Sequence, residues 1–214
     1  MKGKKKILAI VFGVILLVCK HFSLRSPNES ELRWQAYTTL AYGSKCLGWF
    51  TYLTEIPSVR LRWYEDAVIG RDGNRTEHYA MLKRINHEIL NLGPILLKLK
   101  STGVFHTKPV PVRENIVSID IKESNLIKDI DLGQWVVGEF LDPDKQIYMM
   151  LVNRDFTKPQ KSVITFYPKV RDVYMVNKKN GQKKKVKGFD HKTGRMTINM
   201  SAGDGNLYLI SLHR

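Results

Sequence analysis

Hydrophobic positions follow two different patterns along the chain, and the change of pattern predicts two structural regions. Between residues 26 and 99 apolar side chains recur at helical spacing around one short apolar run. From about Val117 onward they form short segments of strand length with period-two alternation. The first pattern predicts a helix–strand–helix α/β unit, and the second predicts an antiparallel β-sandwich. Pro109 and Pro111 indicate a stiff linker between Thr107 and Val117.

The first helix is expected to begin at Ser26, an N-cap residue followed by Pro27 at the first helical position and by Glu29, which completes a capping box. Its apolar positions recur at helical spacing: Leu32, Ala36 and Leu40. Gly43 is placed to end the helix in a left-handed conformation. The aromatic-rich run 46–53 then lacks alternation, as expected for a parallel strand covered on both faces.

A long irregular stretch, 54–75, separates this strand from a second helix that Thr76 is expected to cap. The apolar face of that helix comprises Tyr79, Leu82, Ile85, Ile89 and Leu92. Gly93 and Pro94 are expected to break the helix. Long loops after strands of α/β folds often carry functional residues, so the stretch 54–75 is where we look for a site.

The β region is expected to contain seven main strands: Gln134–Phe140, Ile147–Asn153, Ser162–Tyr167, Val170–Asn177, Lys184–Gly188, Met196–Met200 and Asn206–Leu212. Asn180-Gly181 between two of them is a hairpin signal.

The first 19 residues have the features of an export signal. Four lysines precede an unbroken apolar run from Ile7 to Cys19, which is shorter than the roughly 20 residues of a membrane span. We expect residues 1–25 to be a signal peptide, or alternatively a retained anchor or lipidated segment, with a buried core helix as the third reading. The predicted domains are therefore 1–25, 26–107 and 117–214, and the predicted location is secreted, periplasmic or attached to the cell envelope. The membrane is a partner only if the leader stays uncleaved.

The net charge is +15, but nucleic acid is not expected as a partner. The clustered lysines lie in the leader and around one Asn-Gly turn, and no recognition helix, zinc-ligand set or RNA-binding signature accompanies them. The two cysteines, Cys19 and Cys46, predict no disulfide framework, and Cys46 is interpreted as a small buried apolar residue. His78 and His87 lack the spacing of a helical metal pair, so no metal and no cofactor is predicted.

Several segments in order resemble β-galactosidase-like glycoside hydrolases. Arg33–Lys45 followed by Gly48–Tyr52 resembles the seventh helix and eighth strand of their (β/α)8 barrel. Three further segments resemble the eighth loop and helix and the small β-sandwich after the barrel: Asp72–Thr76, Asn86–Ile89 and Val173–Asn177, with Gly203–Gly205, Leu207 and Tyr208. The resemblance implies the end of a TIM barrel, an α/β fragment, followed by an all-β antiparallel sandwich.

Two departures from the family pattern limit what the resemblance implies. Leu53 stands where the family strand usually ends in Trp. The family's two catalytic Glu residues would precede Leu32, where only a short polar linker follows the leader. A whole barrel needs about 250 residues, more than this chain offers. The resemblance thus implies a hydrolase fragment that is inactive alone.

The candidate site residues follow the predicted strand. Glu55 is a weak candidate for a catalytic carboxylate, with Glu65 and Asp66 on the same loop. The alternative is that Glu55 is solvated and that Glu65 and Asp66 pair with Arg60 or Arg62. The aromatic residues Tyr52, Trp63 and Tyr64 are candidate platforms for sugar rings, or ordinary packing residues.

Two functions remain open at this point. The first is a fragment of a secreted glycoside hydrolase of carbohydrate metabolism, acting on β-linked sugars. The second is a non-catalytic carbohydrate-binding or assembly module. A third, an envelope protein without a sugar ligand, has no motif in its favour. One strand with two helices leaves apolar faces uncovered, which predicts self-association or a missing barrel chain as partner.

Overall fold

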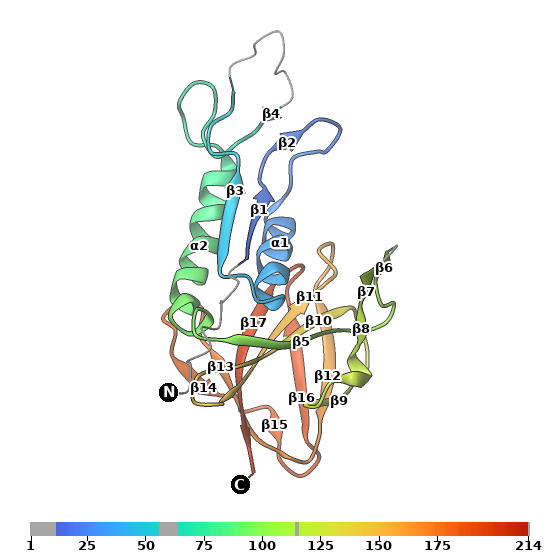
Figure 1. Ribbon diagram of the computed structural model, residues 1–214. Helices are drawn as coiled ribbons and strands as arrows, with labels where there is room; N and C mark the ends of the chain where they lie inside the picture. Colours follow the sequence, from blue (N-terminus) through green and yellow to red (C-terminus); the bar gives the residue numbers. More distant parts are fainter. Residues whose placement is uncertain (1–11, 56–63, 114–115, 214) are drawn as a thin grey trace, which may run out of the picture.

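The computed structural model describes residues 12–55, 64–113 and 116–213 (Figure 1). Strands dominate this part of the chain, and two α-helices accompany them: α1 (Glu29–Ala41) and α2 (Glu77–Leu96). The largest sheet has seven strands in the order β14-β13-β17-β11-β10-β5-β8. Its members are β5 (Lys100–His106), β8 (Ile119–Asp120), β10 (Trp135–Leu141), β11 (Ile147–Asn153), β13 (Val170–Val176), β14 (Lys183–Lys185) and β17 (Gly205–Leu212).

A four-stranded sheet packs on one face of the larger sheet and completes a β-sandwich. Its strands lie in the order β15-β16-β12-β9, namely β15 (Phe189–Asp190), β16 (Arg195–Met200), β12 (Gln160–Phe166) and β9 (Ile127–Ile130). The core between the sheets is built around Trp135, Leu151 and Ile164, which are all fully buried. The predicted sandwich is therefore present, although β5 and β8 pair in parallel.

Helices α1 and α2 cover the other face of the seven-stranded sheet. Tyr37 and Leu92 of the helices pack there against Met150 and Val152 of β11. Alternate residues of β11 point to the two faces, so Met149 and Leu151 enter the inter-sheet core. Because both faces are covered, the whole run 147–153 is apolar or buried and shows no alternation.

The ends of the helices follow local chemistry. Asn28 caps α1 and forms a capping box with Glu31, two residues later than the predicted start at Ser26. Gly43 follows the helix with φ +90°, as expected. Thr76 is the N-cap residue of α2, but its hydroxyl donates to the carbonyl of Ala67 instead of capping the helix.

The predicted break of α2 at Gly93 and Pro94 is wrong. Pro94 lies inside the helix, and the amide of Leu97 still donates to the carbonyl of Gly93 at 2.9 Å. The ammonium of Lys45 also donates to the carbonyls of Leu96 and Leu99, at 2.5 and 2.6 Å. A cation at carbonyls near the C-terminal end of a helix is favoured by the helix dipole, so Lys45 stabilises this end of α2.

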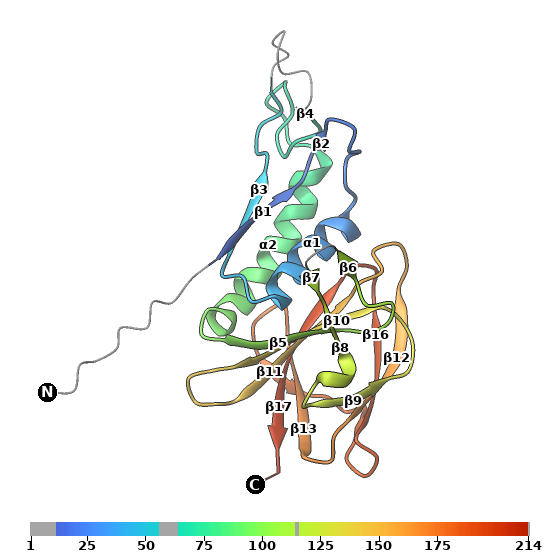
Figure 2. The same cartoon turned by 45° about the vertical axis from the view of Figure 1, so that its right-hand side comes forward.

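Part of the predicted leader forms a strand. β1 (Gly13–Leu17) pairs in parallel with β3 (Cys46–Phe50). Leu16 and Val18 pack against Leu32, Leu82 and Ile85 of the two helices. Figure 2 shows this two-stranded sheet beside the helices and apart from the sandwich.

This arrangement overturns the predicted barrel fragment. The strand β3 has β1 as its partner, and the described residues place no further strand in that sheet. A two-stranded sheet with helices on one face is not the end of a (β/α)8 barrel, in which every strand has two neighbours. The error arose because the apolar run of β1 was assigned entirely to an export signal.

Two smaller corrections concern residues near the predicted boundaries. Cys46 is exposed and Cys19 is buried, the reverse of the environment predicted for Cys46. Strand β5 belongs to the sandwich sheet, so the sandwich begins before Pro109 and Pro111. The remaining elements are short: β2 (Lys20–His21) with β4 (Tyr64–Glu65), β6 (Val112–Arg113) with β7 (Ile116–Val117), and a 3-10 turn, η1 (Ile121–Glu123).

An ionic network joins the helices to the sandwich. Arg33 of α1 binds Glu88 of α2 through two hydrogen bonds, 2.8 and 3.0 Å long. The same guanidinium lies 3.2 Å from Asp204, which Lys178 contacts at 2.7 Å. Charge-assisted, bidentate pairs of this kind fix geometry as well as adding stability. The network therefore fixes how α1 and α2 sit against the sheet.

Candidate functional site

A groove runs between α2 and β3 on the surface of the helical unit. It consists of two adjoining hollows of about 430 and 350 Å³. Trp49, Asn86 and Leu90 line both hollows, so the two hollows lie next to each other along α2. We call the hollow that contains Tyr52 and Tyr79 the upper hollow, and the one that contains Ser44 and Lys45 the lower hollow.

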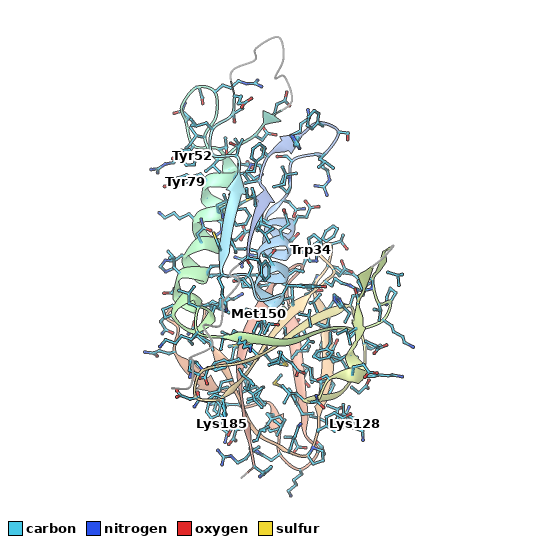
Figure 3. The ribbon with its side chains drawn as sticks, in the orientation of Figure 1. Trp34, Tyr52, Tyr79, Lys128, Met150 and Lys185 are labelled. Carbon is cyan, nitrogen blue, oxygen red and sulfur yellow. The ribbon has the colours of Figure 1, made fainter. Side chains whose placement is uncertain are left out.

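Three aromatic side chains line the upper hollow: Trp49, Tyr52 and Tyr79. The ring of Tyr52 is 61% exposed, so it is available to a ligand. The guanidinium of Arg75 lies over the ring of Tyr79, 4.2 Å from its centroid. Figure 3 shows Tyr52 and Tyr79 near each other at the upper end of α2.

Strand and helix periodicity explain why these residues meet. In β3, Leu47 and Trp49 point toward the helices, while Cys46 and Phe50 are exposed. Residues Tyr79, Lys83, Asn86 and Leu90 recur at three- and four-residue intervals on α2 and so lie on one face. The indole N–H of Trp49 donates to Oδ1 of Asn86 at 3.0 Å, which fixes the ring at the junction of the two hollows.

The polar groups of the groove are cationic or neutral. Lys83, Asn86 and His87 line the upper hollow, and Ser44 and Lys45 line the lower one. Burial lowers the pKa of Lys45, whose ammonium keeps two carbonyl acceptors. Neither hollow is lined by an Asp or Glu residue. The groove can therefore stack and hydrogen-bond a ligand, but it presents no pair of carboxyl groups for acid–base chemistry.

The carboxylates predicted as candidates lie elsewhere. Glu55 is exposed, and its backbone carbonyl accepts a hydrogen bond from Arg71 at 2.8 Å. Glu65 pairs with Lys20 at 2.8 Å, and this hydrogen bond lowers the pKa of Glu65. Asp66 has φ 57° in the following turn. None of the three lines the groove.

Of the predicted aromatic platforms, the structure brings Tyr52 into the groove. Trp63 lies outside the described residues, as do Arg60 and Arg62, and Tyr64 is described only through its backbone pairing in β4. Sequence reasoning missed Trp49 and Tyr79 as site residues. The signal was available in part, since Tyr79 was assigned to the apolar face of the second helix and Trp49 to the strand that precedes it.

The described residues contain no group of three or more His, Cys, Asp and Glu side chains that could hold a metal ion. Neither of the helices in the described part of the chain is long and apolar enough to cross a membrane.

Comparison with known proteins gives remote likenesses. No protein-family model matches the chain, and no curated protein sequence matches it. Two solved structures are similar over 88% of this chain, each with a TM-score of 0.43. They are a candidate alpha-galactosidase from Bacteroides fragilis NCTC 9343, at 8% identity, and a candidate alpha-galactosidase/melibiase from the same strain, at 9% identity. The chain spans 30% of the length of each, and likenesses this remote assign no activity to it.

Proposed function

We propose that this chain binds carbohydrate in the groove between α2 and β3 and does not hydrolyse it. The observation that carries the proposal is the grouping of Trp49, Tyr52 and Tyr79 beside Asn86 and His87. Aromatic rings stack on the apolar faces of pyranose rings, and a few polar groups at the edge orient the hydroxyls. The sequence resemblance of Arg33–Tyr52 to β-galactosidase-like hydrolases supports a sugar as the ligand class.

The absence of hydrolysis follows from the carboxylates. A retaining glycosidase needs two carboxyl groups about 5–5.5 Å apart, and an inverting one needs them about 6.5–9.5 Å apart. No carboxylate lines either hollow, and the exposed Glu55 is outside both. We expect no turnover of chromogenic β-galactosides, β-glucosides or β-mannosides by the purified chain. Hydrolysis that disappears in Glu55→Gln would contradict this part of the proposal.

Binding is tested by titrating the purified chain with neutral oligosaccharides and following tryptophan fluorescence. We expect Tyr52→Ala to weaken binding about two- to tenfold, because one stacked ring contributes about 0.5–1.5 kcal/mol. The matched control is Leu53→Ala, since Leu53 is the adjacent residue, is 56% exposed and does not line the groove. Equal affinities of the two variants would rule out the groove as the sugar site.

A second candidate function is favoured by the β1–β3 sheet. Parallel sheets are normally covered on both faces, yet Ile15 is 75% exposed and Phe50 is 38% exposed on the face away from the helices. A further segment or chain could pack on this exposed face. If that partner supplied the catalytic carboxylates, the assembly would be a glycoside hydrolase. Sequencing the transcript upstream of Met1 tests it, because an in-frame coding segment for such a domain is then expected.

We also propose export across a membrane, directed by the lysines at positions 2 and 4–6 and the apolar run that ends at Cys19. Cell fractionation with sequencing of the mature N-terminus tests this. Intact protein with Met1 in the cytosol would contradict it. Cleavage near Cys19 would remove β1, so Leu16 would be lost from the cluster around Ile85.

A further inference from the structure

We infer that the ligand of the groove is a linear glycan that carries acidic groups, and this inference rests on the proposed function. The first observation is the length of the groove. Its lining residues extend along α2 from Tyr79 to Leu97, the residue that caps the C-terminal end of the helix. At about 1.5 Å per residue this is roughly 27 Å along the helix axis. A single sugar ring would occupy one hollow and leave the other empty, whereas a chain of several sugar units contacts both.

The second observation is the sign of the charges along the groove. Lys83 lines the upper hollow, Lys45 lines the lower one, and Arg75 covers the ring of Tyr79 at the upper end. Within the described residues none of the three forms an ion pair with a carboxylate. Glu88, a carboxylate of the same helix, points instead to Arg33 and the sandwich.

Uncompensated cations in an apolar groove fit a ligand that brings its own negative charge. Lys83 supports this most directly, because its side chain is exposed in the upper hollow and has no carboxylate partner among the described residues. The ammonium of Lys45 in the lower hollow is held by the carbonyls of Leu96 and Leu99 and adds positive charge there.

The spacing and surroundings of these cations favour an acidic glycan over a nucleic acid. Duplex DNA carries one charge per about 1.7 Å of axis and is held by dense phosphate contacts. Here two cations, Lys83 and Lys45, line the groove together with Trp49, Tyr52 and Leu90, and Arg75 lies over the ring of Tyr79. Aromatic platforms between sparse charges suit a uronic-acid chain, in which apolar ring faces and single carboxylates occur in the same repeat.

The test compares oligogalacturonates of one to six units with neutral galacto-oligosaccharides of the same lengths, at low salt and in 0.5 M NaCl. We expect affinity to rise with length until the groove is filled. The acidic chain should bind at least tenfold more tightly than the neutral chain of equal length at low salt. Most of that difference should disappear at high salt, because the ion pairs are exposed to screening.

Variants separate charge in the groove from charge elsewhere. Lys83→Gln should remove most of the preference for the acidic chain, measured as the ratio of the acidic to the neutral affinity, and because Lys83 is exposed we expect the variant to fold normally. Lys161→Gln, at an exposed position of β12 in the far sheet, is the control and should leave that ratio unchanged.

Each outcome distinguishes this inference from the proposed function. Equal affinity for neutral and acidic chains, or for one and six sugar units, would overturn the inference and leave sugar binding intact. Failure of every glycan to bind would overturn the proposed function and the inference with it. Competition by single-stranded DNA or polyglutamate at equal affinity would overturn the inference, because the groove would then recognise charge and not a sugar.

Discussion

The seven-stranded sheet and the two-stranded β1–β3 sheet contain equally apolar strands but bury them to very different extents. In β11 all residues from Tyr148 to Asn153 are buried, because helices cover one face and the second sheet covers the other. In β1 only one face is covered, so Leu16 is 5% exposed while the adjacent Ile15 is 75% exposed. An apolar run therefore predicts a strand, while the layers around it decide how much stability each side chain contributes.

The largest difference between the sheets should appear when one apolar side chain is truncated in each. Leu151→Ala is expected to lower the free energy of unfolding by about 3–4 kcal/mol, because it leaves a cavity between two packed layers. Ile15→Ala should change it by less than about 0.5 kcal/mol, since its side chain is mostly solvated. Urea denaturation of both variants measures this. Equal losses would mean that the exposed face of β1 is covered in solution.

The helices that support the β1–β3 sheet are joined to the seven-stranded sheet by the ionic network around Arg33. Arg33→Met leaves Glu88 and Asp204 without their shared guanidinium and should cost about 3 kcal/mol. Arg25→Met, which removes a pair between Glu31 and a side chain 68% exposed, should cost less than about 1 kcal/mol. Thermal or urea unfolding compares the two. A larger loss for the Arg25 variant would show that the network is not the main link.

Acid should weaken this link through Glu88. Burial raises the pKa of Glu88, but hydrogen bonds from Arg33 and Tyr37 and the charge of Lys178 outweigh it and lower the pKa to about 2. Since the unfolded pKa is about 4.5, the unfolded state binds more protons between these values. The contribution of Glu88 to the free energy of unfolding is therefore complete above pH 4.5. It falls by on the order of 2 kcal/mol as the pH is lowered toward 2. Glu88→Gln should be less stable at pH 7 and lose this pH dependence.

A separate effect of similar size is expected at His106 of β5, whose Nε2 lies 2.8 Å from the hydroxyl of Tyr42 at the end of α1. Burial, together with the charge of Arg154, lowers the pKa of His106 from 6.5 to about 4. Between pH 6.5 and 4 the imidazole of His106 is protonated in the unfolded state and neutral in the folded state. The free energy of unfolding therefore decreases by about 2 kcal/mol as the pH is lowered through this range. His106→Gln should flatten the stability curve there and leave the Glu88 window unchanged. An unaltered slope in the variant would place the titration elsewhere.

The sandwich was predictable from sequence because its signals are local. The run 147–153 coincides with β11, and Asn180-Gly181 connects β13 to β14 with Gly181 at φ +70°. The helices were predictable from their apolar spacing, but tertiary contacts altered their ends. Pro94 removes one hydrogen bond of the helix, but α2 continues past it to Leu96, where the ammonium of Lys45, distant in sequence, binds the helix end.

The helical unit and its groove were less predictable, because they depend on pairing between distant segments. The apolar positions of β1 satisfy the pattern of an export signal equally well, and only its pairing with β3 reveals a structural role. Tyr52 was identified from its place after a strand, and the structure puts it in the groove. Trp49 and Tyr79 were missed because each looked like packing within its own element, and a groove exists only where two elements meet.

The position of the helices has a consequence for synthesis of the chain on the ribosome. Tyr37 and Leu92 are made before the sheet they cover, whose interior strand β17 begins at Gly205, roughly a hundred residues after α2 ends. At about 5–20 residues per second, the apolar sides of α1 and α2 wait several seconds or longer for their partner. During that interval the nascent chain exposes an apolar surface that a chaperone can bind. Release from the chaperone then depends on β17, the last strand to be translated, because the sheet that covers this surface is incomplete without it.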